Sequence, residues 1–175
     1  MSSPRILVAG IGNIFFGDDG FGCQVAQSLQ HRELPAGVRV IDFGIRGLDL
    51  TYALLDGYAT AILVDAVPRG SPPGTLYVIE PDPVPAASAD GQPQSIALDP
   101  HNLDPAKVLQ LVQALGGHVD RIVVIGCEPA QLGSEEDLID GLSEVCRAAV
   151  PRAVELVESL ITEVLAGGAS PCAAS

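Results

Sequence analysis

The sequence predicts an α/β fold, in which helices cover both faces of an open sheet. Short apolar runs rich in β-branched residues alternate along the chain with segments whose apolar residues recur at helical spacing. The first strand, helix and second strand form a β-α-β unit of about the usual ~30 residues, and a helical crossover makes its strands parallel. A length of 175 residues, 47% of them hydrophobic, suits one domain, predicted over residues 1–166.

The first β-α-β unit is bounded by clear signals. Residues 6–10 form a short apolar run typical of a strand buried on both faces. Residues 20–33 carry apolar side chains at helical spacing, and Pro35 and Gly37 stop the helix. The second strand is predicted over residues 38–42.

The other predicted elements continue the alternation. They are strands at 60–65, 74–80 and 121–126 and helices at 48–55, 105–115 and 139–165. Residues 81–100 hold five prolines and are expected to form an irregular loop, of a length that is uncommon unless it is functional or disordered. Residues 167–175 are expected to be a disordered tail.

Charge and composition exclude several function classes. Nine basic against 22 acidic residues give a net charge of −13, which repels phosphate backbones, so we expect no nucleic-acid partner. No apolar run approaches the ~20 residues that span a bilayer, and the N-terminus lacks the pattern of a secretory signal. We therefore expect a cytoplasmic protein without a membrane partner. The four cysteines are spaced as reduced thiols rather than as a disulfide framework or zinc site.

Acidic residues follow the predicted strands. Asp18 and Asp19 lie in the loop after the first strand, Asp42 ends the second, and Asp65 ends the third. Ligands of a parallel α/β sheet bind at the carboxyl ends of its strands. We expect these carboxylates to crowd one sheet edge, where their mutual repulsion favours a cation.

The glycine loop at 10–22 also suggests a dinucleotide site, but two features argue against it. The third glycine of the pattern would fall at Phe15, and two carboxylates occupy the helix start that a pyrophosphate would need. Nucleotide binding would require Asp18 and Asp19 to lie away from this loop.

A divalent cation fits the same residues better. Asp19 or Asp18, together with Asp65 and one imidazole, would supply three ligands and leave positions open for water or substrate. His101 follows the long loop and is the candidate imidazole, whereas His31 and His118 are interpreted as structural. The competing interpretation is that Asp18 or Asp19 only caps the first helix.

Other polar or reactive residues are interpreted as structural. The acids from Glu128 to Glu144 are expected to form a solvated surface, and Cys127 is expected to lie in the core.

Four motifs together resemble the nickel–iron hydrogenase maturation endopeptidases. They are ILVAGIGN at 6–13, GDDGFG at 17–22, LVDA at 63–66 and PHNL at 100–103, in order along residues 5–165. The resemblance implies a three-layer α/β/α sandwich around a twisted, mostly parallel sheet of about five strands. It also implies a protease that removes a C-terminal extension from the hydrogenase large-subunit precursor after nickel insertion.

By the same resemblance, the residues that contact metal are Asp19, Asp65 and His101, with Asp42 as a candidate catalytic or proton-handling group. The nickel is carried by the precursor, and other divalent ions are able to occupy the site. Many relatives have Asp-Gly-Gly-Thr after the second strand, where this chain has Asp42-Phe43-Gly44-Ile45, followed by Arg46. The alternative function is a non-enzymatic nickel-binding or docking module for hydrogenase assembly.

Overall fold

A computed structural model describes residues 5–81 and 105–167 of the chain. Its five strands are β1 (Ile6–Ile11), β2 (Val38–Gly44), β3 (Thr60–Ala66), β4 (Leu76–Ile79) and β5 (Arg121–Cys127). Its helices are a 3-10 turn η1 (Asp18–Gly20), α1 (Phe21–Gln30), α2 (Gly47–Leu54), α3 (Pro105–Ala114) and α4 (Glu144–Leu165). The predicted α/β fold is confirmed.

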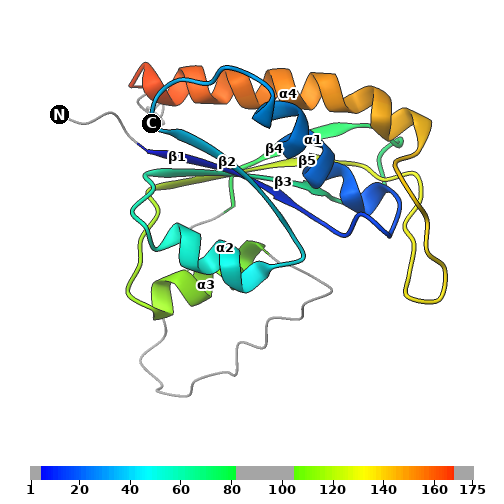
Figure 1. Ribbon diagram of the computed structural model, residues 1–175, viewed down its shortest axis with the longest axis horizontal. Coiled ribbons are helices and arrows are strands. Elements are labelled where there is room, and N and C mark those ends of the chain that lie inside the picture. Colours follow the sequence, from blue (N-terminus) through cyan, green and yellow to red (C-terminus); the bar gives the residue numbers. More distant parts are fainter. Residues whose placement is uncertain (1–4, 82–104, 168–175) are drawn as a thin grey trace, which may run out of the picture.

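The strands form one sheet in the order β2-β1-β3-β5-β4. The first four of these strands are parallel, and β4 pairs antiparallel with β5 at the edge. Helices α1 and α4 cover one face, and α2 and α3 cover the other (Figure 1). The carboxyl ends of β1, β2, β3 and β5 therefore lie at one edge.

Each face of the sheet has its own apolar core. Alternate side chains of β1 point to opposite faces, so that Ile6 and Val8 pack with α1 and α4 while Leu7 and Ala9 pack with α2 and α3. All four of these strand residues are fully buried. This two-sided burial explains why the parallel strands are continuous apolar runs.

Glycines let α1 approach the sheet closely. A Cβ at Gly22 would collide with the backbone carbonyls of Val64 and Ile11. A Cβ at Gly10 would lie 2.6 Å from the Cβ of Ala26. The glycines near the start of the chain thus serve helix–sheet packing, and this close approach fixes the position of η1 just before α1.

Two predicted helix boundaries were wrong. The first helix ends at Gln30 rather than at residue 33. The last helix begins at Glu144 rather than at residue 139, because the Ser143 side chain caps it by accepting a hydrogen bond from the Cys146 N–H. Within residues 5–81 and 105–167, no helix has the length and apolar character needed to cross a bilayer. The predicted tail after Gly167 and most of the predicted loop lie outside these residues.

Candidate active site

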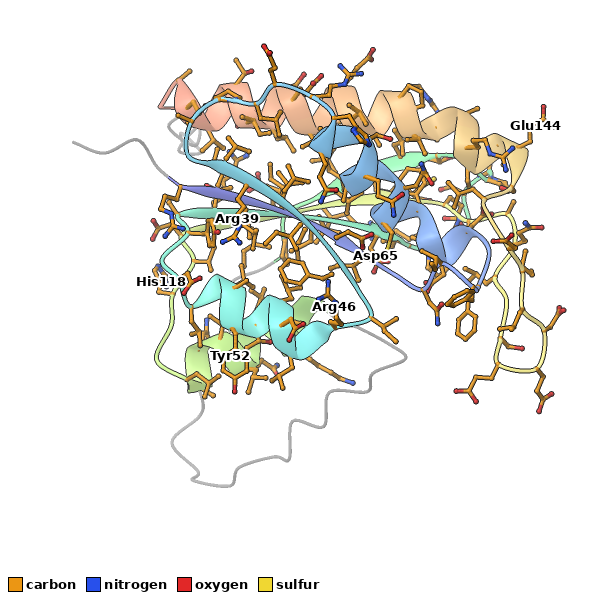
Figure 2. The ribbon with its side chains drawn as sticks, viewed as in Figure 1. Arg39, Arg46, Tyr52, Asp65, His118 and Glu144 are labelled. Atoms are coloured by element: carbon orange, nitrogen blue, oxygen red, sulfur yellow. The ribbon has the colours of Figure 1, made fainter. Side chains whose placement is uncertain are left out.

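Asp19 and Asp65 come from neighbouring elements at the carboxyl edge of the sheet. Asp19 belongs to η1. Asp65, which is labelled in Figure 2, is the second-last residue of β3. The backbone N–H of Asn13 donates a 2.7 Å hydrogen bond to Oδ2 of Asp19. Asp65 accepts a 2.8 Å hydrogen bond from the N–H of Ala66 through Oδ1. Among residues 5–81 and 105–167, no hydrogen bond reaches the second oxygen of either carboxylate, so each has capacity for a ligand.

The environment of both carboxylates disfavours their negative charge. Burial raises the pKa of Asp19, although the hydrogen bond from Asn13 partly opposes this effect. The pKa of Asp65 is raised well above its ordinary value, first by burial and then by the negative charge of Asp19. A cation bound at these two carboxylates would stabilise their charged forms, which burial and, for Asp65, the charge of Asp19 disfavour.

The buried thiol of Cys23 interacts electrostatically with Asp42 as well as with Asp19 and Asp65. Cys23 of α1 donates a 3.4 Å hydrogen bond to the carbonyl of Gly12. Burial raises the pKa of the Cys23 thiol, and Asp42 raises it further through a hydrogen bond and its charge, followed by the charges of Asp19 and Asp65. The thiol therefore stays protonated, which makes it a poor nucleophile and a suitable hydrogen-bond donor.

The carboxylate of Asp42 is held by two further donors. The N–H of Gly44 donates to Oδ1 at 3.0 Å, and the side-chain amide of Gln27 donates to Oδ2 at 3.2 Å. Asp42 is thus fixed between the end of β2 and α1. It is an oriented group beside the acidic pair.

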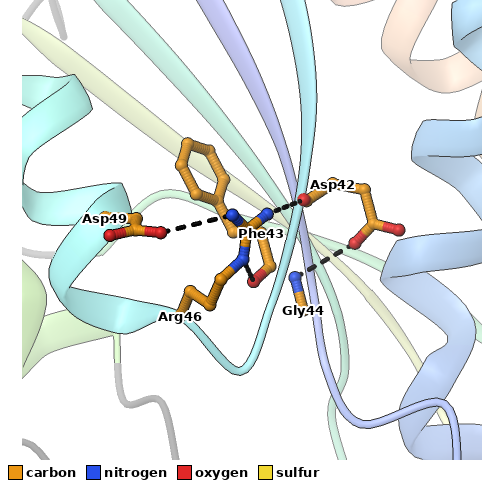
Figure 3. A network of polar contacts seen from close by, with 5 residues as sticks. All are labelled: Asp42, Phe43, Gly44, Arg46 and Asp49. Atoms are coloured by element: carbon orange, nitrogen blue, oxygen red, sulfur yellow. Dashed lines mark hydrogen bonds and ion pairs between the residues drawn. The ribbon is translucent and has the colours of Figure 1, made fainter.

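Arg46 closes the corner between β2 and α2 (Figure 3). Its guanidinium donates to the backbone carbonyls of Asp42 at 2.7 Å and Phe43 at 3.1 Å, and it pairs with Asp49 at 3.2 Å. Phe43 is buried in the core below α2, whereas Ile45 is exposed. The residues that depart from the Asp-Gly-Gly-Thr pattern therefore build a rigid corner and leave one apolar side chain at the surface.

Asp18 has a structural role that the sequence analysis did not assign. Its fully buried carboxylate accepts hydrogen bonds from the N–H groups of Ala130, Gln131 and Ser143 and from the Ser143 hydroxyl, at 2.7–2.9 Å. Burial raises the pKa of Asp18, but the backbone bonds from Gln131, Ser143 and Ala130 outweigh burial and lower it overall. Asp18 caps neither η1 nor α1 and does not join the acidic pair.

Glu128 corrects a second expectation, because it is buried rather than part of a solvated surface. Its carboxylate accepts a 2.6 Å bond from the Tyr77 hydroxyl and bonds from the N–H groups of Arg69 and Gly70. The Tyr77 bond is the main cause of its lowered pKa. Glu128 therefore anchors the loop that follows β3. Cys127 is buried as expected, and burial raises its pKa to about 12.

The imidazole of the predicted cation site lies outside the described residues, since His101 falls between residues 81 and 105. Of the described histidines, His31 follows α1, and His118 precedes β5, at the far end of the molecule from Asp65 (Figure 2). Within the described ranges, no three His, Cys, Asp or Glu side chains are grouped to hold a metal ion. Asp19 and Asp65 would therefore need a ligand from elsewhere.

The glycine loop does not offer a phosphate site. The Asn13 N–H, which a phosphate would need, already donates to Asp19. A Cβ at Gly12 would collide with the Asp19 carbonyl, so this glycine serves the close packing of the loop against η1. The condition for nucleotide binding, that Asp18 and Asp19 lie away from the loop, is not met.

Sequence reasoning missed Cys23 as a neighbour of the acids, although a signal exists. Cys23 follows Asp19 by four residues, and Cys23 and Gln27 are four residues apart in α1, a spacing that places their side chains on one helix face. For Asp18 no local signal exists, because its partners lie more than 110 residues away along the chain.

The fold and site together define a small α/β protein with an acidic site at the carboxyl edge of a parallel sheet. The family model for HycI, described as hydrogenase maturation protease, matches residues 23–160. The chain belongs to the hydrogenase maturation protease family.

Relatives and solved structures agree with this assignment. The chain is 36% identical over 158 residues to a protein of Methanocaldococcus jannaschii that is named a hydrogenase maturation protease, covering 90% of this chain and 96% of that protein. The hydrogenase expression/formation protein HupD of Rhizobium leguminosarum is 33% identical, with 87% and 72% covered. The hydrogenase maturating endopeptidase HybD of Escherichia coli superimposes with a TM-score of 0.70 at 25% identity, covering 91% and 93%. These likenesses make the protein an enzyme of the protease class.

Proposed function

We propose that this enzyme removes the C-terminal extension of a nickel–iron hydrogenase large-subunit precursor after nickel has been inserted. In this proposal Asp19, Asp65 and His101 contact the nickel that the precursor carries. The observation that carries the proposal is the Asp19–Asp65 pair, whose raised pKa values and available oxygens favour a cation between them.

The donor set suits a metal that arrives with the substrate. Two carboxylates and an imidazole are three ligands, fewer than the four of a closed structural site, and imidazole suits nickel. A precursor that supplies the remaining ligands would complete the coordination sphere only when nickel is present. Metal occupancy would then report that the substrate is ready for cleavage.

The residues around the pair support proton handling rather than covalent catalysis. The Cys23 thiol is coupled electrostatically to Asp42, Asp19 and Asp65, and its raised pKa keeps it protonated. Asp42 is oriented by Gly44 and Gln27 and is suited to accept or pass a proton at its carboxylate. A substrate metal ion beside these groups would polarise the scissile carbonyl or lower the pKa of a bound water.

The test compares nickel-loaded with nickel-free precursor, incubated with the purified enzyme and analysed for the shortened product by mass spectrometry. We expect cleavage of the loaded precursor alone, with many turnovers per enzyme molecule. Equal cleavage of both forms would contradict the role of nickel. Stoichiometric binding without cleavage would instead support the non-enzymatic module.

A second arm tests the ligands. Asp19→Asn should abolish discrimination between the two forms of precursor and reduce cleavage, because an amide is a weaker cation ligand than a carboxylate. Asp56→Asn, the same change at an exposed acid after α2, is the matched control and should cleave at the wild-type rate. Unchanged cleavage by Asp19→Asn would remove Asp19 from the site.

A further inference from the structure

Residues 129–142 and residues 13–17 form one lobe beyond the carboxyl edge of the sheet, here called the paired lobe. In Figure 1 its longer segment projects as the yellow loop away from the helices and strands. Backbone hydrogen bonds of 2.9–3.0 Å join the two segments: Gly17 to Ile139, Gly133 to Phe16, and Ile139 to Phe15. A Cβ at Gly133 would lie 2.8 Å from the carbonyl of Asp137, so the lobe is tightly folded.

The paired lobe exposes apolar side chains although its backbone is ordered by these bonds. It holds four of the ten large hydrophobic residues that are exposed in residues 5–81 and 105–167. They are Ile14, Phe15, Leu132 and Leu138, with exposed fractions of 50%, 58%, 49% and 64%. Single exposed hydrophobics are ordinary, but a group on one rigid projection is typical of a protein-binding surface.

The charge of the paired lobe has one sign. Its four charged residues are all acidic: Glu135, Glu136, Asp137 and Asp140. All four are exposed, and the chain has no lysine or arginine between Arg121 and Arg147. A projection that exposes both apolar side chains and carboxylates is complementary to a partner surface that combines apolar and basic residues.

The lobe is coupled to the acidic pair through Asp18. The Asp18 carboxylate binds the N–H groups of Ala130, Gln131 and Ser143 at the two ends of the lobe, while the next residue along the chain is Asp19. A partner seated on the lobe would therefore rest on a segment held rigidly relative to Asp19. This continuity favours the protease's own protein substrate as the occupant.

We infer that the paired lobe is the docking surface for the hydrogenase large-subunit precursor, which it recognises through a basic, apolar patch. This inference rests on the proposed function. Docking there would position the precursor before its extension reaches the acidic pair, so the lobe determines affinity and the pair determines turnover.

The experiment measures kcat and KM separately with the nickel-loaded precursor. Leu132→Ser with Leu138→Ser should raise KM about tenfold and leave kcat nearly unchanged, because both side chains lie outside the acidic site. Glu136→Lys with Asp137→Lys should also raise KM, and it should reduce the salt dependence of KM. Tyr52→Ser on α2 and Glu155→Lys on α4 are exposed controls away from the lobe and should match wild type.

The outcomes separate the two proposals. If the wild-type enzyme does not cleave the precursor, the proposed function fails. If it cleaves and the lobe variants keep the wild-type KM, the docking inference fails although the function stands. Loss of a concentration-dependent dimer in sedimentation, with unchanged KM, would show that a second copy occupies the lobe and would overturn the inference. Circular dichroism of each variant shows that it has folded.

Discussion

Asp18 and Asp19 are adjacent in sequence and have opposite environments. Asp18 accepts four hydrogen bonds, and its pKa is lowered. Asp19 accepts one backbone hydrogen bond from Asn13, and burial raises its pKa. Hydrogen-bond donors thus surround the carboxylate of Asp18, which holds the paired lobe in place, whereas the carboxylate of Asp19 has a single donor.

This difference separates a structural acid from a candidate functional one. A carboxylate whose oxygens are satisfied stabilises the protein in its charged form, whereas a buried carboxylate with few donors destabilises it until a ligand arrives. Asp65 belongs to the second kind, and Glu128 to the first. Neutralising each acid in turn tests this difference in environment.

Asp65→Asn should have the largest effect. We expect cleavage of the nickel-loaded precursor to fall about 1000-fold, since Lewis-acid stabilisation of a transition state is worth several kcal/mol. The same variant should melt at a higher temperature than wild type at neutral pH, because the amide carries no buried charge. Single-turnover kinetics and calorimetry measure the two effects.

The pH dependence gives a second readout for Asp65. Because its folded-state pKa is raised, the stability gained from the protonated form is fully present below the ordinary value of 3.8 and is lost as pH rises through the raised pKa. In Asp65→Asn, the free energy of unfolding should no longer fall over this pH range. A variant that melts earlier than wild type at neutral pH would contradict the assignment of Asp65 as an unsatisfied acid.

Asp18→Asn should have the opposite effect on stability. The amide cannot accept from all the donors that face Asp18, and we expect a loss of about 2–3 kcal/mol in the free energy of unfolding. The lowered pKa means that the stability from Asp18 is present above 3.8 and is lost as pH falls through the lowered value. Urea unfolding at pH 7 and at acid pH measures both effects, and a stability equal to that of Asp65→Asn would contradict the comparison.

The sequence predicted the fold class, the order of the elements and the placement of Asp42 and Asp65 at strand ends, because these follow from local periodicity and from the geometry of parallel sheets. It could not separate Asp18 from Asp19. The partners of Asp18 lie 112, 113 and 125 residues away, so no local pattern contains them.

The late start of α4 and the burial of Glu128 have a related cause. Residues 139–143 extend the helical pattern of α4 in the sequence, but the backbone of Ile139 bonds with Phe15 and Gly17 instead. Glu128 looks like a surface acid in the sequence, yet Tyr77 and the loop after β3 supply its donors. Tertiary hydrogen bonds of this kind override local propensity.

Asp19→Asn tests how much the charge of Asp19 contributes to the raised pKa of Asp65. Removing the Asp19 charge should lower the pKa of Asp65 but leave it above 3.8, because burial is the larger cause of the shift. Carbon-detected NMR titration of the Asp65 carboxyl measures this change. Asp18→Asn is the control and should leave the pKa of Asp65 unchanged. A return of Asp65 to its ordinary pKa would make the mutual charge, rather than burial, the dominant cause.

Cys23→Ala should have the smallest effect. The variant loses the thiol bond to the Gly12 carbonyl and the contact with Asp42, so we expect kcat/KM to fall about fivefold, in line with the ~1 kcal/mol of one hydrogen bond. Cys23→Ser should recover most of the activity, because a hydroxyl also donates to these acceptors. In the wild-type enzyme, the raised pKa should protect Cys23 from iodoacetamide at pH 8, as followed by peptide mass spectrometry. If Cys23→Ala abolished cleavage and Cys23→Ser failed to restore it, the thiol itself would take part in the chemistry. Cys23 would then be a catalytic residue rather than one that orients Asp42.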